Sequence, residues 1–493
     1  MTIGRGKAAS SFAWSALEGG GLSLISFLSL VAFSRVLAPT DFGLFATALA
    51  LLELFSLVSN LAFHDALVQI PELTEAHKNT AFTITMAVSV VFSLLFWAAG
   101  PLFAMAMHNP KAGPMLGVLG GAFILNGFSA TLTAQQRRDF HFRTLALRSL
   151  VGRLSGAAVG IGAALLGAGA WSLIIQQLCM AGLSSAVLWI ASDERPRFGF
   201  DGPVARQLTI FGLGAAGAEF VNAGIKRLFV TACGVLLGPA AAGYISIGFR
   251  MVDTLWGVSA MAIYQVILPI MSRLQGDRAR LYEVFRRSQT LTCILLYAAF
   301  MALAAESPRV VTLLFGARWL PASGYLTVFC FMMLIQVPRM LSVPLLTALG
   351  RPRDVLLGYC TGTIYMMLAI AFVPFSSATA VVIVWFGTEI VYAPVFAFLL
   401  FRRSGIGPLA QLRNIAVPLI AAGALYGGIL TSGDLMEGRL NGFLILILSG
   451  AIGGILFLTV VGLLDRESVG ELRALVLSRG RKGALATGAV ADS

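Results

Sequence analysis

The sequence contains few charged residues for a protein of its length. Asp, Glu, Lys and Arg make up 12% of its 493 residues, whereas soluble domains carry about 25%. Apolar and aromatic residues make up 58%, above the ~45–50% that is usual in soluble domains. A water-soluble globule of this composition would lack the polar side chains needed to cover its surface. The composition therefore predicts an integral membrane protein.

Cysteines and catalytic motifs are also scarce. The five cysteines are odd in number, form no CxxC pair and fall within apolar runs, so they indicate neither a disulfide framework nor a metal site. The sequence has no phosphate-binding glycine loop, no GxSxG nucleophile elbow and no HExxH helix. The loops between apolar runs are too short to hold a soluble catalytic domain. We expect a protein that is not an enzyme and that holds no metal or cofactor.

Long apolar runs recur along the whole chain. A helix needs roughly 20 mainly apolar residues to cross the hydrocarbon core of a bilayer, where only helices and closed barrels satisfy their backbone. Fourteen segments qualify, so we predict an all-α protein with about 14 transmembrane helices. The run over 145–192 is too long for one span and is divided at 167–169. The predicted spans are 11–36, 42–66, 80–106, 113–134, 145–167, 170–192, 207–235, 240–268, 289–306, 322–347, 354–375, 378–400, 412–431 and 441–464.

Basic residues are unevenly distributed between the loops. The two terminal segments and every second loop contain 25 Lys and Arg residues, and the opposite loops contain five. Because cytoplasmic loops retain an excess of Lys and Arg, both termini are predicted to be cytoplasmic. The same distribution accounts for the net charge of +12 without a nucleic-acid partner.

An internal repeat links the two halves of the chain. The pattern LxPxxxG at 37–43 recurs at 237–243, between the first two spans of each half. Parallel repeats of membrane helices build many transporters, although proline and glycine also recur through turn chemistry alone. We predict two six-helix lobes related by a parallel repeat, followed by two further helices. The predicted parts are the lobes 1–194 and 206–403, the helix pair 410–464 and a cytoplasmic tail over 465–493.

The seventh span carries the most informative polar residues. Glu219, Asn222 and Lys226 are spaced i, i+3, i+7 and share one helical face, and Arg227 lies about 100° round the helix from Lys226. Charged side chains in a bilayer cost about 2.5–3.5 kcal/mol each on insertion scales and usually face water or one another. We interpret this face as the wall of a cavity. The alternative is that Lys226 and Arg227 snorkel to the interface.

The first, second and eighth spans carry matching polar residues. The first contains Glu18, and the second contains Glu53 and Asn60 on one helical stripe. The eighth contains Arg250 and Asp253 at i, i+3, and Asp253 is 200 residues from Glu53, as in the repeat. These spans and the seventh are predicted to line a central cavity between the lobes. Alternatively, Arg250 and Asp253 form only an intrahelical ion pair that makes both easier to insert.

Three groups of residues near the span ends form recognisable motifs. They are Val36, Leu37, Ala38, Pro39, Asp41, Phe42, Gly43, Leu44 and Phe45 with Ala66, Leu67, Val68, Gln69, Leu73, Thr74, Asn79, Thr80 and Ala81; Gln136, Arg137, Arg138, Asp139, Phe140, Phe142 and Arg143; and Leu237, Gly238, Pro239, Gly243, Tyr244 and Arg250. These groups resemble Wzx-type polysaccharide flippases of the multidrug/oligosaccharidyl-lipid/polysaccharide (MOP) exporter superfamily. The resemblance extends over nearly the whole chain and is specific for the family, not for the sugar carried.

The resemblance implies a bacterial inner-membrane transporter of fourteen spans. Such a protein moves undecaprenyl-pyrophosphate-linked oligosaccharide units to the periplasmic leaflet by alternating access of its lobes, for export of an exopolysaccharide, capsule or O-antigen. Its expected partners are the lipid-linked oligosaccharide, membrane lipids, and a polysaccharide polymerase with its export machinery. Because pyrophosphate is a dense anion, Lys226, Arg227 and Arg250 are the expected contacts through charge-assisted hydrogen bonds.

The acidic residues depart from the family pattern. Related flippases also place basic residues in the cavity from the first lobe, whereas the first two spans here contain Glu18 and Glu53 and no mid-span Lys or Arg. Because a carboxylate in low dielectric holds its proton more tightly, Glu18, Glu53 and Glu219 are candidates for coupling transport to a cation gradient. Two other functions stay open on sequence alone: a cation-coupled multidrug exporter of the same superfamily, and a membrane assembly protein that transports nothing.

Overall fold

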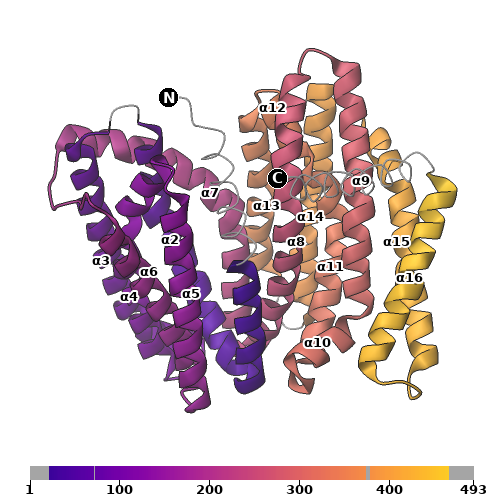
Figure 1. Cartoon of the computed structure of the whole chain (residues 1–493), viewed down its shortest axis with the longest axis horizontal. Helices are drawn as coiled ribbons and strands as arrows, with labels where there is room; N and C mark the ends of the chain where they lie inside the picture. Colours follow the sequence, from indigo (N-terminus) through magenta and orange to yellow (C-terminus); the bar gives the residue numbers. More distant parts are fainter. Residues whose placement is uncertain (1–21, 71–72, 374–377, 466–493) are drawn as a thin grey trace, which may run out of the picture. The chain divides into compact units, whose positions relative to one another are not determined.

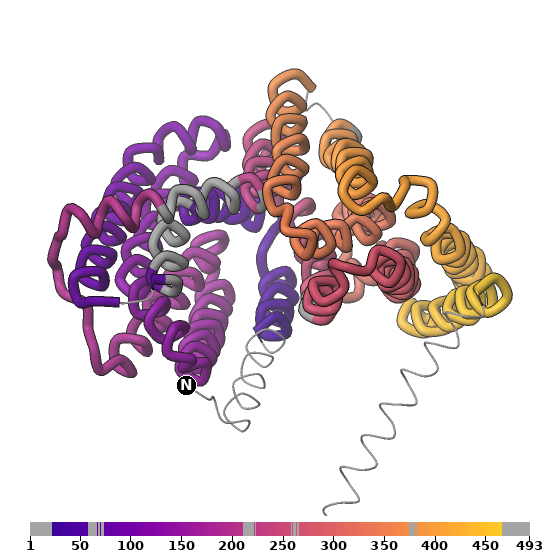
Figure 2. Tube along the Cα trace, turned by 90° about the horizontal axis from the view of Figure 1, so that it is seen from above, coloured from indigo at the N-terminus to yellow at the C-terminus, as the bar shows by residue number. Residues whose placement is uncertain are grey.

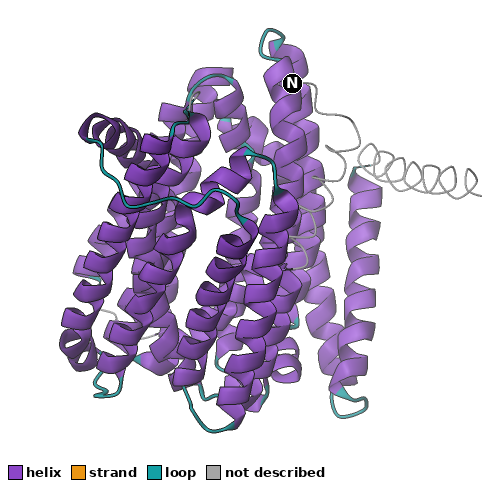
Figure 3. Ribbon diagram, turned by 60° about the vertical axis from the view of Figure 1, so that its left-hand side comes forward, coloured by secondary structure: helices purple, strands orange, loops and turns teal. Residues whose placement is uncertain are grey.

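The computed structural model describes residues 22–70, 73–373 and 378–465, which contain helices and no strand (Figure 3). This confirms the predicted all-α class. After the helix Leu22–Val36, the elements are α2 (Pro39–Gln69), α3 (Glu75–Ala106), α4 (Ala112–Arg138), α5 (Phe142–Leu165), α6 (Trp171–Ala191), α7 (Gly202–Leu237), α8 (Pro239–Arg273), α9 (Arg278–Ala305), α10 (Ser307–Phe315), the 3₁₀ turn η1 (Ala317–Trp319), α11 (Ala322–Met340), α12 (Ser342–Ala348), α13 (Pro352–Phe372), α14 (Ala378–Ser404), α15 (Pro408–Met436) and α16 (Gly442–Leu464).

Each predicted span overlaps a helix in the part that the structure describes; residues 11–21 of the first span lie outside it. In the described part of the chain, ten helices are long and apolar enough to cross a membrane. The other four predicted spans contain the shorter helix Leu22–Val36 and the helices α5, α7 and α8.

The division predicted within 145–192 is confirmed. α5 ends at Leu165 and α6 begins at Trp171. Gly167 and Gly169 adopt φ values of +85° and +54°, a region that side chains other than glycine rarely enter. The glycines therefore allow the tight reversal between two spans.

The segment that follows α9 contains structure that the sequence analysis treated as a loop. Val311 and Phe315 of α10 are buried. Glu306, just before α10, is also buried and pairs with Arg309 at 3.1 Å. Ser449 of α16 donates a hydrogen bond to the same carboxylate at 2.5 Å. This contact fastens α16 to the end of α9.

The chain forms two compact units. The first comprises the described residues up to Ile247 together with Met366–Val384, and the second comprises Gly248–Tyr365 and the residues from Trp385 onward. In the first unit, α7 packs along α2, α3 along α4, and α5 along α6 (Figure 1). Because α7 packs on α2, residues beyond 206 belong to the first compact unit. The lobe boundaries expected from the repeat stay a prediction.

The core of the first unit determines which face of α2 is polar. Leu44, Ala48 and Leu52 are buried at a spacing of four residues, in one cluster with Phe96 of α3 and Leu119 of α4. Phe45 and Leu49, each one position further along the helix, are only partly buried against this cluster. Glu53 continues their spacing of four residues and is exposed, so α2 becomes polar at that position.

The linker after α6 is held along the start of α3. Asn79 Oδ1 accepts a hydrogen bond from the Arg197 backbone N–H at 2.7 Å. Thr83 Oγ1 accepts one from the Gly199 backbone N–H at 3.0 Å. The linker between α6 and α7, residues 192–201, thus has its backbone hydrogen-bonded to α3 before α7 begins.

In the second unit, α15 and α16 form an antiparallel pair, and α15 packs along α9 (Figure 1). Figure 2 shows this pair, coloured yellow, along one edge of the unit. These two helices are the ones that lie outside the sequence repeat.

Candidate functional site

An ion pair joins α2 to α7 inside the first compact unit. Arg227 Nε lies 3.3 Å from Glu53 Oε2, and the side chains are 29% and 47% exposed. Glu53 follows the start of α2 by fourteen residues, which at ~1.5 Å per residue is about 21 Å along the helix. A hydrocarbon core is ~30 Å thick, and charged groups at such depth face water or one another. The pair marks a polar surface within the predicted membrane region.

The antiparallel packing of α2 and α7 explains why these two residues meet. A Cβ on Gly234 would lie 2.0 Å from Thr47 Oγ1, so the two helices touch closely at that level. Glu53 is six residues further along α2, and Arg227 is seven residues back along α7. The two charges are therefore at matching depths.

The guanidinium of Arg227 is only partly satisfied. Its Nη1 donates to the carbonyl oxygen of Ala223 at 2.9 Å. Its Nε is buried and, within the described residues, has no partner in hydrogen-bonding geometry. Its charged partner is Glu53 Oε2, at 3.3 Å. An anionic oxygen that replaced this carboxylate in better alignment would accept a charge-assisted hydrogen bond from the guanidinium.

The sequence identifies both residues as intramembrane charges but does not predict that they pair. It placed Glu53 on a polar stripe of the second span and Arg227 beside a polar face of the seventh. Opposite charges at matching depths in two spans were the available signal. Which spans are neighbours, however, is determined by packing that a single sequence does not display.

The structure describes the remaining first-unit candidates to different extents. Lys226 is half-buried. Glu18 lies outside the described residues, as do the side chains of Asn60, Glu219 and Asn222, although the backbone at these last three positions is helical. Their roles stay predictions.

Arg250 and Asp253 lie on α8 within the second compact unit. Both are exposed, and Thr254 Oγ1 donates to the Arg250 carbonyl oxygen at 2.7 Å. Their predicted share in a cavity with the first-unit residues stays a prediction.

The second unit contains a different kind of ion pair, between α11 and α14. Arg339 Nε and Nη2 donate to the two oxygens of Glu389, each at 2.9 Å. The side chains are only 8% and 5% exposed. The guanidinium also lies 4.9 Å from the Tyr392 ring centre and 5.3 Å from that of Phe396. Each charge satisfies the other, which gives the pair a structural role.

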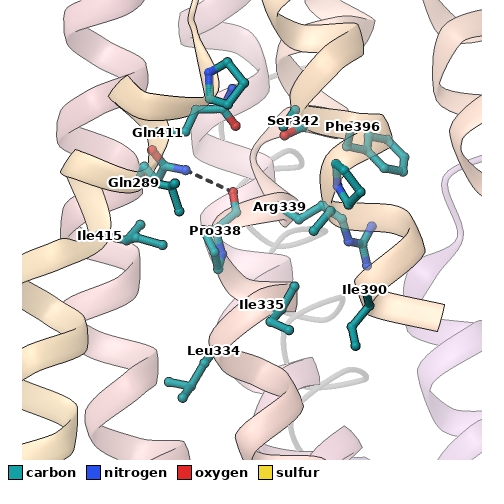
Figure 4. Close-up of a pocket in the computed structure, with 15 residues that line it drawn as sticks. Gln289, Leu334, Ile335, Pro338, Arg339, Ser342, Ile390, Phe396, Gln411 and Ile415 are labelled. Carbon is teal, nitrogen blue, oxygen red and sulfur yellow. Dashed lines mark hydrogen bonds between the residues drawn. The ribbon is translucent and has the colours of Figure 1, made fainter. Parts of the chain in front are cut away.

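A cavity of about 450 Å³ adjoins this buried pair (Figure 4). Gln289 donates across it to the Pro338 carbonyl oxygen at 3.3 Å, and Gln411 donates to the Ile406 carbonyl oxygen at 3.1 Å. Arg339 donates to Glu389. These three polar side chains of the cavity are thus already engaged with the protein, so the site between α2 and α7 is the stronger candidate for binding an anion. The cavity is lined by Gln289, Leu334, Ile335, Pro338, Arg339, Ser342, Ile390, Ala393, Pro394, Phe396, Ala397, Pro408, Gln411, Leu412 and Ile415.

Comparison with known proteins identifies the family. Residues 32–324 match the family described as "Polysaccharide biosynthesis protein". The chain belongs to this family. It is 25% identical over 484 residues to the succinoglycan biosynthesis transport protein ExoT of Rhizobium meliloti, covering 97% of each chain. It is 20% identical over 339 residues to the lipopolysaccharide biosynthesis protein WzxC of Escherichia coli, covering 67% of this chain and 68% of the relative.

Solved structures agree on the fold. The lipid II flippase MurJ, in an inward closed conformation, matches with a TM-score of 0.75 at 13% identity, over 93% of this chain and 100% of that chain. An inward-facing multidrug MATE transporter of the MOP superfamily matches with a TM-score of 0.52 at 12% identity, over 83% and 96%. The sequence resemblance to Wzx-type flippases of the MOP superfamily is confirmed. The chain is therefore a multi-pass membrane protein of a polysaccharide biosynthesis and transport family.

Proposed function

We propose that the protein flips undecaprenyl-pyrophosphate-linked oligosaccharide units from the cytoplasmic to the periplasmic leaflet of the inner membrane. Membership of a polysaccharide biosynthesis family supports the substrate class. The Arg227–Glu53 ion pair, deep within the predicted membrane region, is the observation that carries the proposal, because a guanidinium there can exchange a carboxylate for a pyrophosphate oxygen. The excess of basic residues on one set of loops supports cytoplasmic termini.

In this proposal the pyrophosphate competes with Glu53 for Arg227. Its oxygens take up the Nε donor, and Lys226, next in the chain, adds a second positive charge. Arg250 contributes from the second repeat. The oligosaccharide contacts polar side chains such as Asn60 and Asn222, while the lipid chain stays in the bilayer.

The lobes 1–194 and 206–403 would rock against each other to expose the site alternately to the two sides. The helix pair 410–464 moves with the second lobe, because α15 and α16 are fastened to α9. A polysaccharide polymerase that consumes the flipped units is the expected partner on the far side of the membrane.

Glu53 is the acidic residue best placed to couple this cycle to a proton gradient. When the substrate takes Arg227, the Glu53 carboxylate loses its positive partner, which leaves it free to bind the coupling cation. Glu18, Glu219 and Asp253 are further coupling candidates. A cationic drug is a poorer cargo for this site, because Arg227 already occupies Glu53 and would repel a second cation.

A leaflet-resolved assay in reconstituted vesicles tests the proposed function. The substrate is a defined undecaprenyl-pyrophosphate-linked oligosaccharide, and the variants are Arg227→Ala, Arg227→Lys and, as a control, Arg353→Ala at an exposed position. We expect Arg227→Ala to lower the flipping rate at least tenfold, Arg227→Lys to retain part of it, and the control to match the wild type. Unchanged flipping by Arg227→Ala would remove Arg227 from the substrate site.

A further inference from the structure

The starts of α2 and α8 carry the same motif and touch each other within the first compact unit. Pro39 and Pro239 open the two helices, and Gly43 and Gly243 follow one turn later. A Cβ on Gly43 would lie 1.5 Å from the Pro239 carbonyl oxygen, and a Cβ on Gly243 would lie 2.2 Å from the Pro39 carbonyl oxygen. The contact is reciprocal, with the glycine of each repeat packed on the proline carbonyl of the other.

Only glycine fits at both positions. Where another residue would carry Cβ, each glycine directs a Cα hydrogen toward the opposite carbonyl oxygen, a contact that recurs where helices approach closely and that is individually weak. No side-chain rearrangement relieves a clash at these distances, because the opposing atoms are backbone. Any larger residue must push the two helix starts apart.

The contact also joins residues that are equivalent in the two sequence repeats. The four residues are equivalent in pairs under the 200-residue repeat, and equivalent residues meet directly only at a symmetry axis between two copies. The pseudo-twofold axis that relates the two helix starts therefore passes between Gly43 and Gly243.

We propose that Gly43 and Gly243 form the closed end of the transport path on the side of the membrane where α2 and α8 begin. The inference rests on the proposed transport function and adds to it the positioning residues that close one side. Glu53 lies ten residues beyond Gly43 in α2, about 15 Å deeper at ~1.5 Å per residue. When the contact forms, it blocks access to the Glu53–Arg227 pair from that side; when it separates, the pair becomes accessible.

A second glycine contact provides a matched control. Gly100 of α3 and Gly113 of α4 also pack reciprocally, since a Cβ on either would lie 2.9 Å from the carbonyl oxygen of the other. Both belong to the first predicted lobe and have no reason to separate during transport. A substitution there perturbs packing without opening a path.

The test measures access to a reporter cysteine below the proposed closure. Ser56→Cys, one turn beyond Glu53, is placed in a protein whose five native cysteines have been replaced. Gly43→Ala, Gly243→Ala or Gly100→Ala is then added. Membrane vesicles of both orientations are exposed to a membrane-impermeant maleimide, and thermal stability is recorded for each variant.

We expect Gly43→Ala and Gly243→Ala each to raise the labelling rate at least tenfold from the side where α2 begins, and Gly100→Ala to lower stability without raising that rate. If Gly43→Ala does not fold, Gly243→Ala, which clashes less, provides the same measurement. Wild-type labelling in a folded Gly243→Ala protein would overturn the inference, and so would equal labelling in all three variants. Labelling needs no substrate. The result therefore stays interpretable even if the proposed lipid-linked oligosaccharide is not the substrate.

Discussion

Thr290 of α9 donates a hydrogen bond from its Oγ1 to the carbonyl oxygen of Asn414 in α15, at 2.9 Å. Pro418, four residues after Asn414, has no N–H to donate to that carbonyl, so Thr290 supplies the missing donor from a neighbouring helix. The Asn414 side chain in turn donates to Gln289 Oε1 at 2.9 Å. The break that proline makes in the α15 hydrogen-bond ladder becomes a polar link to α9.

α11 shows the same compensation. Pro338 lacks the N–H that would bond to the Leu334 carbonyl oxygen, and the buried Tyr297 hydroxyl of α9 donates to that oxygen at 2.6 Å. Thr290 and Tyr297 are seven residues apart and therefore lie on one face of α9. One face of α9 thus supplies hydrogen-bond donors to the carbonyl oxygens left without a partner by proline in α15 and in α11.

Thr290→Val is expected to destabilise the protein by about 1–3 kcal/mol, because a buried carbonyl loses its donor while the side-chain shape is kept. Thermal unfolding in detergent measures the change. Thr431→Val, in the same helix α15, is the control, since Thr431 is exposed and bonds only within its own helix. Equal effects of the two substitutions would show that the link to α9 contributes nothing specific.

Arg339→Ala is expected to destabilise the protein by about 3–5 kcal/mol, because it leaves the Glu389 carboxylate buried without its partner. The double variant Arg339→Met with Glu389→Leu should recover most of the stability, since it removes both buried charges. Thermal unfolding and gel filtration provide the comparison. A double variant less stable than Arg339→Ala would contradict a purely structural role for the pair.

Glu53→Gln is expected to abolish the dependence of flipping on a proton gradient, because an amide neither takes up nor releases a proton. Arg227 also loses its charged competitor, so the pyrophosphate-linked substrate should bind several-fold more tightly. Flipping is measured in vesicles with and without an imposed pH gradient, and binding by titration. Gradient dependence retained in Glu53→Gln would assign coupling to another residue.

Asn79→Ala is expected to speed tryptic cleavage of the linker after Arg197, because the linker backbone loses its tie to α3 at that residue. Time courses followed on gels give the rate, with cleavage elsewhere in the protein as the internal reference. We expect an increase of at least threefold, corresponding to ~0.7 kcal/mol for loss of one hydrogen bond. An unchanged rate would mean that the other linker contacts suffice.

Most of the helices and little of the site followed from the sequence. Apolar runs of spanning length located the helices, and Gly167 and Gly169 marked the reversal between α5 and α6. The same patterns gave no account of α10, whose burial of Val311 and Phe315 depends on neighbouring helices. They also identified Glu53 and Arg227 as intramembrane charges without indicating that the two pair.

By itself the sequence determined membrane residence, the helical class and the family, because the cost of exposing backbone and charge to lipid acts on each segment separately. Only the tertiary structure decided that Glu53 meets Arg227 and that Gly43 meets the Pro239 carbonyl. Those pairings depend on which helix faces lie against one another. The residues are 174 and 196 positions apart, and their local patterns do not reveal how the helices pack.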